Sequence, residues 1–265
     1  MTEADGLLLS GVTVRFGGVT AVDGLSLHAP VGRITGLIGP NGAGKTTSFN
    51  ASCGLVPCAA GSVQLGGRDI TRARPAVRAR LGLGRTFQRM QLFRSMTVRD
   101  NLVVAYEAKL AGSNPWRQMV RGRADRRKTD AAVDATLRLC SLELVAESVV
   151  GALSTGQQRL VDLARACVAG AEVLLLDEPS SGLDRIETSR FADILGRLMA
   201  DRTIAILLVE HDMGLVMSVC QYLYVLDFGK QIFEGTPADT RASSVVRAAY
   251  LGSDVGIEAP SGSVA

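Results

Sequence analysis

A glycine-rich stretch with the residue types of a phosphate-binding loop occupies residues 39–46, Gly-Pro-Asn-Gly-Ala-Gly-Lys-Thr. It fits the pattern G-x-x-x-x-G-K-[ST] and stands between a β-type run and a helix-forming segment, which is the setting this chemistry requires. Its glycines allow successive backbone N–H groups to point at one anion, and a helix starting near Gly44 adds its positive end. Lys45 can then reach the β- and γ-phosphates of a triphosphate, and the Thr46 hydroxyl can ligate Mg²⁺. A plain glycine-rich turn is the alternative interpretation.

Two adjacent carboxylates, Asp177 and Glu178, follow an apolar run at 173–176. A triphosphate site needs an acid at the end of another strand, and Asp177 would bind Mg²⁺ there through water. Glu178 could polarise the attacking water. Because neighbouring carboxylates beside a triphosphate repel each other, the metal ion and Lys45 must compensate their charge. Taken alone, the pair could equally be a helix N-cap or surface acids.

A second candidate anion site lies at residues 153–158, Leu-Ser-Thr-Gly-Gln-Gln. Ser154 and Gln157 have the spacing of a capping box, which predicts a helix start. Such a start would expose backbone amides at Gly156, and these amides can bind an anion. Since the chain already has one phosphate loop, a second anion site makes sense if it binds a nucleotide held by another copy. An ordinary capped helix explains the spacing as well.

Alternating apolar strands and helical segments predict an α/β fold with a mostly parallel sheet. Thr97 and Asp100 have the spacing of a capping pair that opens a helix. The block from about residue 101 to 154 shows no strong strand pattern, so we expect an inserted helical subdomain there. We expect strands over 7–16, 33–38, 62–65, 81–87, 172–176, 203–209 and 222–226, and helices over 45–52, 131–140, 157–168, 185–200 and 213–220.

Composition excludes several classes of protein. The chain has 265 residues, of which 47% are hydrophobic and 21% charged, so disorder is not its main state. A net charge of +3 is too small to argue for nucleic acid. Five cysteines without a C-x-x-C pair favour a reducing compartment. The start MTEADG lacks the features of a signal peptide.

Two further features concern membranes. The apolar runs at 173–176 and 204–209 are far shorter than the roughly 20 residues of a membrane span, so any membrane role must be peripheral. Residues 114–130 are rich in Arg and Lys. They form either a solvated surface loop or a contact with acidic lipid or a partner. Nucleic acid is the least favoured ligand there, because only Trp116 is available for stacking.

Six motifs occur in the order seen in ATP-binding-cassette (ABC) ATPases, and the sequence resembles this family over about residues 7–251. The resemblance implies one ABC ATP-binding domain over 1–252: a P-loop NTPase α/β core with a mostly parallel sheet, an antiparallel β edge and an inserted α-helical subdomain. The core would span about 7–96 and 155–252, the helical subdomain about 97–154, and 253–265 a disordered tail. The motifs are GPNGAGKTT from Gly39, RTFQ ending at Gln88, LSTGQ from Leu153, LLLDEP from Leu174, SSGLD ending at Asp184 and EHD from Glu210.

The resemblance implies three catalytic residues, Glu178, His211 and Gln88. His211 would hydrogen-bond the γ-phosphate and position Glu178, while Gln88 would sense Mg²⁺ and the water and couple to a membrane partner. A lone Gln is usually a surface residue and a lone His structural, so both assignments depend on the order of the motifs. The implied metal ligands are Thr46, Gln88 and Asp177.

The resemblance also implies a shared nucleotide site. Phe16 is similar to the aromatic residue that stacks on adenine, although alone it would be a core Phe. Ser154 and Gly156 would contact the γ-phosphate across a head-to-tail dimer, with Asp184 at the interface. The implied set of ATP-binding residues is Phe16, Asn41, Gly42, Gly44, Lys45, Thr46, Thr47, Ser154, Gly156 and Gln157.

Three places depart from the usual family pattern: Thr155 stands where Gly or Tyr is usual, Ser180-Ser181 where SAG or AAG is more common, and Ser48 where Leu is frequent. Because the phosphate-facing residues are intact, we expect altered rates at most.

Several stretches resemble the ATP-binding subunits of high-affinity branched-chain amino-acid importers, among them RTFQ at 85–88 and AYLG at 249–252. Similar ATPases serve urea or short amides, or lipopolysaccharide export. The implied ligands are ATP and Mg²⁺, and the implied partners are a second cassette (identical or paralogous), transmembrane permease subunits and, indirectly, a solute-binding protein. The implied location is cytoplasmic, peripheral on the inner face of the cell membrane.

Two alternatives come from other classes of protein. A soluble ABC ATPase acting on nucleic acid or ribosomes is disfavoured, because such proteins usually join two cassettes or carry coiled-coil insertions. This chain has one P-loop and no heptad run. A catalytically silent regulatory module is opposed by the intact Glu178 and His211.

Overall fold

The computed structural model describes residues 6–86, 90–111, 123–201 and 203–251. Gln88, most of the basic stretch 114–130 and the tail 253–265 therefore lie outside the described residues.

A six-stranded sheet forms the centre of the molecule, in the order β10-β9-β3-β8-β7-β6. The pairs β3–β8, β3–β9, β7–β8 and β6–β7 are parallel, and only β9–β10 is antiparallel, which confirms the mostly parallel sheet. Every residue of β3, β7 and β8 is buried, as expected where helices cover both faces. The strands are β3 (Ile34–Ile38), β6 (Leu83–Arg85), β7 (Val173–Asp177), β8 (Ala205–Val209), β9 (Tyr222–Asp227) and β10 (Lys230–Gly235).

A four-stranded antiparallel sheet, β2-β1-β4-β5, forms the expected β edge. It consists of β1 (Gly6–Phe16), β2 (Val19–Pro30), β4 (Ala60–Leu65) and β5 (Arg68–Asp69). The sequence analysis missed β2. Its first half is exposed and interrupted by Gly24 at a positive φ of 68°, so the alternating pattern of a strand begins only at Leu25.

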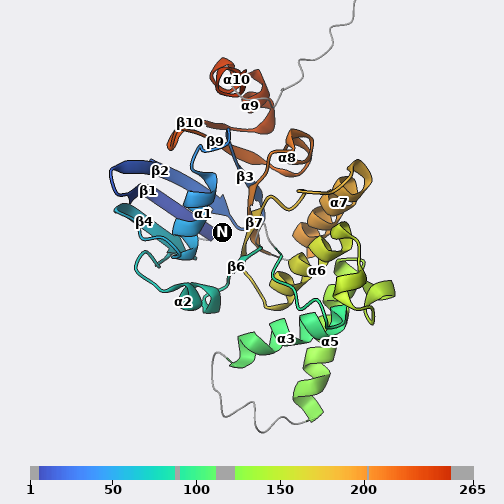
Figure 1. Ribbon diagram of the computed structural model, residues 1–265. Coiled ribbons are helices and arrows are strands. Elements are labelled where there is room, and N and C mark those ends of the chain that lie inside the picture. Colours follow the sequence, from blue (N-terminus) through green and yellow to red (C-terminus); the bar gives the residue numbers. More distant parts are fainter. Residues whose placement is uncertain (1–5, 87–89, 112–122, 202, 252–265) are drawn as a thin grey trace, which may run out of the picture.

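Helix α1 (Lys45–Cys53) lies between the antiparallel strands and the parallel sheet, as Figure 1 shows. Its buried Phe49 belongs to one hydrophobic cluster with Leu7 of β1 and Leu175 of β7. Helices α6 (Thr155–Val168), α7 (Arg185–Asp201) and α8 (Met213–Val219) belong to the second cluster, on the other face of the sheet. The phosphate-loop helix is therefore held by packing on both sides.

The chain between β6 and α6 is helical, as expected. It contains α3 (Val98–Ala111), α5 (Arg123–Leu139) and the 3₁₀ turns η1 (Glu143–Val145) and η2 (Val150–Ala152). Buried Leu102 and Val133 share one core with Leu160 of α6. The Thr97 hydroxyl accepts a hydrogen bond from the Asp100 N–H at 3.0 Å, which confirms the predicted cap. Helix α5 starts earlier than the predicted 131–140, because its first turns are strongly charged and carry no apolar pattern.

Three short helices were not predicted: α2 (Pro75–Arg80), α9 (Pro237–Ala242) and α10 (Ser244–Leu251). Two of them begin with Pro at the first turn, and each is too short for a helical period to emerge. Tyr250 of α10 is buried and its hydroxyl hydrogen-bonds the backbone of Gly39, so the last described helix packs against the phosphate loop. All five cysteines carry free thiols. None of the helices in the described ranges has the length and apolarity to span a membrane.

Candidate functional site

The phosphate loop connects β3 to α1 and takes a conformation that only glycine accommodates. Gly39, Gly42 and Gly44 have φ values of 150°, 81° and 100°. A Cβ on Gly39 would lie 2.1 Å from the Leu226 carbonyl oxygen, and one on Gly44 would lie 2.6 Å from that of Ala21. A Cβ on Gly42 would meet nothing within 4 Å, so this position faces open space. The loop is thus pressed against β2 and β9 at its two ends and open at its middle.

Lys45 points back into the loop. Its Nζ donates hydrogen bonds to the carbonyl oxygens of Gly39 at 2.6 Å and Pro40 at 2.8 Å. Burial lowers the pKa of Lys45, and the charges of Glu178 and Asp177 oppose that shift. An ammonium has three donors, so Lys45 can keep one loop contact and still reach a phosphate. Around it, Asn41, Gly42 and Thr46 are exposed, and Gly44 and Thr47 are partly buried.

The two carboxylates lie at the carboxyl end of β7, on the same edge of the sheet as the loop, because β7, β8 and β3 are parallel neighbours. Asp177 is the last residue of β7 and only 4% exposed, so it is neither an N-cap nor a surface acid. Its Oδ2 accepts a hydrogen bond from Arg85 at 2.7 Å. Glu178 has a φ of 48°, a left-handed conformation that side-chain-bearing residues adopt at a cost of about 1–3 kcal/mol and mostly at functional sites.

His211 follows β8, the strand next to β7. Its Nε2 hydrogen-bonds Oε1 of Glu178, which is the pairing the motif order implied. The Glu178 backbone N–H donates to the carbonyl of Val209 at 2.8 Å, and this bond fixes the strained turn to β8. The structure therefore brings Lys45, Asp177, Glu178 and His211 together at one edge of the sheet.

Glu210 is a residue whose position the sequence analysis did not interpret. It is 2% exposed, and its carboxylate accepts backbone hydrogen bonds from Ser180 at 2.6 Å and from His211 at 2.9 Å. A single buried side chain thus holds the segment after β7 to the segment after β8. The sequence did offer a signal for this role, because Glu210 directly follows an apolar strand. A charged residue at that position must be paired in the interior or serve a function.

The motif at 153–158 opens α6 with the predicted capping box. The Ser154 Oγ accepts from the Gln157 N–H at 3.2 Å, and the Gln157 Oε1 accepts from the Ser154 N–H at 3.1 Å. Ser154 Oγ also donates to Glu187 Oε1 at 3.3 Å, and a Cβ on Gly156 would lie 2.5 Å from that same oxygen. Glu187, which the sequence analysis did not single out, is itself capped by Asp184, whose Oδ1 accepts from the Glu187 N–H at 2.7 Å. This second group of residues forms its own cluster, with a carboxylate at the helix start.

Phe16 ends β1 and is 51% exposed, which contradicts the alternative of a core phenylalanine. It pairs with Val19 across the β1–β2 turn. Ala21 lies two residues further along β2, and its carbonyl oxygen lies next to Gly44. An exposed aromatic ring thus stands on the strand pair that borders the phosphate loop. Gln88 lies outside the described residues, but Thr86 does not: its Oγ1 accepts from the Asp177 N–H at 3.4 Å.

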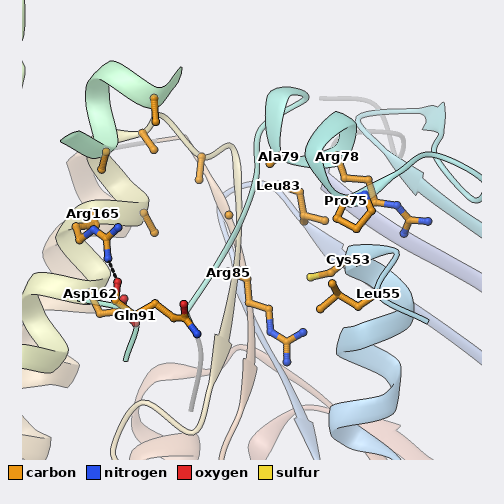
Figure 2. Close-up of a pocket in the computed structure, with 16 residues that line it drawn as sticks. Cys53, Leu55, Pro75, Arg78, Ala79, Leu83, Arg85, Gln91, Asp162 and Arg165 are labelled. Atoms are coloured by element: carbon orange, nitrogen blue, oxygen red, sulfur yellow. Dashed lines mark hydrogen bonds between the residues drawn. The ribbon is translucent and has the colours of Figure 1, made fainter. Parts of the chain in front are cut away.

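A cavity of about 410 Å³ lies between the helical segment and the core, and Figure 2 shows its walls. One wall carries Asp162 and Arg165 of α6, and the opposite wall carries Cys53 and Leu55 at the end of α1, with α2 above them. Arg85 at the end of β6 lies between the two walls, and Gln91 also lines the cavity.

Comparison with known proteins gives the family. Residues 22–181 match the ABC transporter family. The chain belongs to the ABC transporter family. It is 37% identical over 249 residues to the high-affinity branched-chain amino acid transport ATP-binding protein BraF of Pseudomonas aeruginosa, covering 93% of this chain and 97% of BraF. It is 36% identical over 249 residues to LivG of Escherichia coli, a protein of the same description, with the same coverage.

Solved structures agree with this placement. The ADP conformation of MJ1267, an ATP-binding cassette of an ABC transporter, superposes with a TM-score of 0.80 at 27% identity, covering 94% of this chain and 99% of that chain. A nucleotide-free ABC cassette superposes with a TM-score of 0.79 at 27% identity, covering 94% and 100% of the two chains. The chain therefore has the ABC cassette fold, and it is an ABC-type ATPase.

Proposed function

We propose that this ATPase powers a membrane importer of branched-chain (hydrophobic) amino acids. Relatives with this description are 36–38% identical over 93% of the chain. The lipopolysaccharide export system ATP-binding protein LptB of Escherichia coli is 31% identical over 248 residues, covering 94% of this chain and 98% of LptB. Lipopolysaccharide export is therefore one alternative function. Urea or amide uptake is the other alternative within the family, and no observation favours nucleic acid.

The hydrolytic chemistry rests on one observation: the Glu178–His211 hydrogen bond at the sheet edge that carries Lys45 and Asp177. In the proposed site the loop 39–47 binds the phosphates, Lys45 neutralises the β- and γ-phosphates, and Phe16 stacks on adenine. Glu178 accepts a proton from the attacking water, and His211 holds the Glu178 carboxylate in place. Charge stabilisation by fixed donors is the main contribution expected of such a site.

The donor set fits Mg²⁺. Thr46, Asp177 and Gln88 would hold the ion, which supplies charge neutralisation at the γ-phosphate when bound. All three side chains offer oxygen, the ligand Mg²⁺ prefers. Within the described residues, no group of three or more His, Cys, Asp or Glu side chains is arranged to hold a metal ion by itself.

We infer that the start of α6 completes the site of a second cassette. Ser154, Gly156 and Gln157 would contact the γ-phosphate bound to the facing copy, with Asp184 at the interface. The capping box supports this, because it fixes the free N–H groups of a 14-residue helix in one direction. The facing cassette is identical or paralogous. ATP binding would close the dimer, and hydrolysis would reopen it.

The cavity between α1 and α6 is the proposed docking place of the transmembrane permease subunits. It is lined by residues of the proposed core, about 7–96 and 155–252, and by Ala105 and Ala108 of the proposed helical block, about 97–154. Gln91, three residues after Gln88, also lines it. The cassette would then sit in the cytoplasm, peripheral on the inner face of the membrane, and a solute-binding protein would act indirectly through the permease.

Glu178→Gln tests the proposal in cells of the source organism. We expect the variant to bind ATP, to accumulate as a dimer, and to turn over ATP about 10²–10⁴-fold more slowly. Cells carrying it should lose uptake of labelled leucine, isoleucine and valine while urea uptake is unchanged. Wild-type ATP turnover by the variant contradicts the base assignment. Normal leucine uptake alongside lost turnover contradicts the cargo assignment. Copurification with RNA instead of permease subunits supports the soluble alternative.

A further inference from the structure

Arg85 is a buried charged residue that begins the RTFQ motif and to which the sequence analysis gave no role. It ends β6, its side chain is 8% exposed, and its two terminal nitrogens bind different partners. One donates to Oδ2 of Asp177 at 2.7 Å and the other to Oδ1 of Asn50 at 2.7 Å. The guanidinium also lies over the ring of Phe49, 5.7 Å from its centroid. Its geometry is therefore fixed from three sides.

These contacts join three elements of the proposed site. Asn50 and Phe49 belong to α1, the helix that follows the phosphate loop, and Asp177 ends β7. Arg85 itself stands three residues before Gln88. In Figure 2 the Arg85 side chain extends from β6 toward the helix that carries Cys53. Through Arg85, hydrogen bonds connect Asn50 of α1 to the Asp177 carboxylate.

The arrangement matters for charge and for direction. Asp177 and Glu178 are adjacent carboxylates, and Lys45 alone would balance only one of them. Arg85 supplies the second positive charge inside the protein. It also takes one oxygen of Asp177, Oδ2, and leaves Oδ1 as the oxygen that can turn to a ligand. A buried ion pair adds little net stability compared with an apolar replacement, so its presence points to specificity of position.

We propose that Arg85 is a positioning residue for Asp177. It holds the Asp177 carboxylate in the orientation that receives the divalent cation, and through Asn50 it ties that orientation to the phosphate-loop helix. This inference rests on the proposed function, since it assumes that Asp177 serves a nucleotide-bound metal ion.

The test measures metal binding apart from turnover. Mn²⁺ binding to the full-length protein, saturated with a non-hydrolysable ATP analogue, is titrated by electron paramagnetic resonance. Binding of the analogue without metal is measured in parallel. Changing a residue that orients a metal ligand typically costs 10–100-fold in metal affinity. We therefore expect Arg85→Gln to weaken Mn²⁺ binding by about 10-fold or more, with metal-free analogue affinity within about 2-fold of wild type.

Three further variants separate positioning from folding. Arg85→Lys keeps the charge but lacks the planar fork, so it should restore part of the Mn²⁺ affinity. Asn50→Ala removes only the tether and should have a smaller effect of the same sign. Arg99→Gln is the matched control, because Arg99 also binds two acceptors, Asp134 at 2.7 Å and Glu147 at 2.8 Å, in the helical segment. It should leave Mn²⁺ affinity unchanged.

Each outcome has one meaning. A folded Arg85→Gln protein with wild-type Mn²⁺ affinity overturns the proposal, and so does an equal loss of metal-free analogue binding, which indicates a structural role. If Arg85→Gln does not fold, the graded order of Arg85→Lys and Asn50→Ala decides, and wild-type affinity in both overturns it. If the wild-type protein itself shows no analogue-dependent Mn²⁺ site, the proposed function fails instead.

Discussion

Glu210→Gln is the sharpest test of how the catalytic edge is held together. The Glu210 carboxylate is 2% exposed and accepts backbone N–H groups of Ser180 at 2.6 Å and His211 at 2.9 Å, one on each oxygen. In glutamine one oxygen becomes an NH₂ group, so one of these N–H donors must face another donor. A hydrogen bond to a charged group is worth about 1.5–3 kcal/mol, and an unpaired buried donor costs a similar amount. We expect the free energy of unfolding to fall by about 2–3 kcal/mol.

Two assays follow from this magnitude. For a chain of this size, such a loss lowers the melting temperature by about 5–10 °C in a thermal melt. Because His211 loses a backbone anchor, kcat should fall by about 10–100-fold, as a 1 Å displacement of a catalytic group can cost that much. The KM for ATP should stay within about 2-fold, since the phosphate loop has its own contacts.

The control and the refuting result are equally concrete. Glu147→Gln removes a carboxylate whose side chain is 75% exposed, and such surface pairs contribute about 0–1 kcal/mol. Its melting temperature should move by at most about 2 °C. If Glu210→Gln melts and turns over ATP like wild type, then Glu210 does not connect the two segments, and the reasoning is wrong.

Three other predictions follow from the site. Lys45→Ala should abolish binding of a fluorescent ATP analogue, because the buried ammonium is the main positive charge of the loop, and unchanged affinity would exclude the loop as the nucleotide site. Glu187→Gln should be combined with Glu178→Gln and the dimer measured in a sizing assay. We expect the ATP concentration for half-maximal dimerisation to fall by about 2–5-fold, because the carboxylate bound to Ser154 competes with phosphate for the start of α6. A higher ATP concentration for half-maximal dimerisation would argue against this competition. Burial raises the pKa of Tyr250 to about 12. The pKa of tyrosine is about 10 in the unfolded chain. The buried neutral hydroxyl therefore contributes stability that is complete below about pH 10 and is lost as pH rises toward about 12, up to about 3 kcal/mol. Denaturant titrations should show this decline in wild type and a smaller one in Tyr250→Phe, and identical slopes would contradict the burial.

Much of the fold could be read from local patterns. The continuous apolar runs at β3, β7 and β8 predicted buried parallel strands because a strand covered on both faces has no polar side. The caps at Thr97 and Ser154 were predictable because their hydrogen bonds span only three residues. By contrast, β2 was missed because its pairing with β1 is set by the partner strand and by bulges that break the alternation of buried and exposed residues.

The motifs indicated the phosphate-binding chemistry of the site, because a phosphate loop needs glycines at fixed spacing and a lysine directly after them. Lys45, Asp177 and Glu178 could be assigned this way. Glu210 could not, since its two backbone partners come from segments thirty residues apart and meet only when β7 and β8 pair.

The local sequence thus determined most helices and strands, their caps and the phosphate-binding chemistry of the site, because each of these depends on residues a few positions apart. Folding added the partners of charged side chains: Arg85 to Asp177, Glu210 to Ser180, and Glu187 to Ser154. Those contacts join residues 30 to 92 positions apart, and a charge in the core finds its partner by the packing of strands and helices, which no local pattern records.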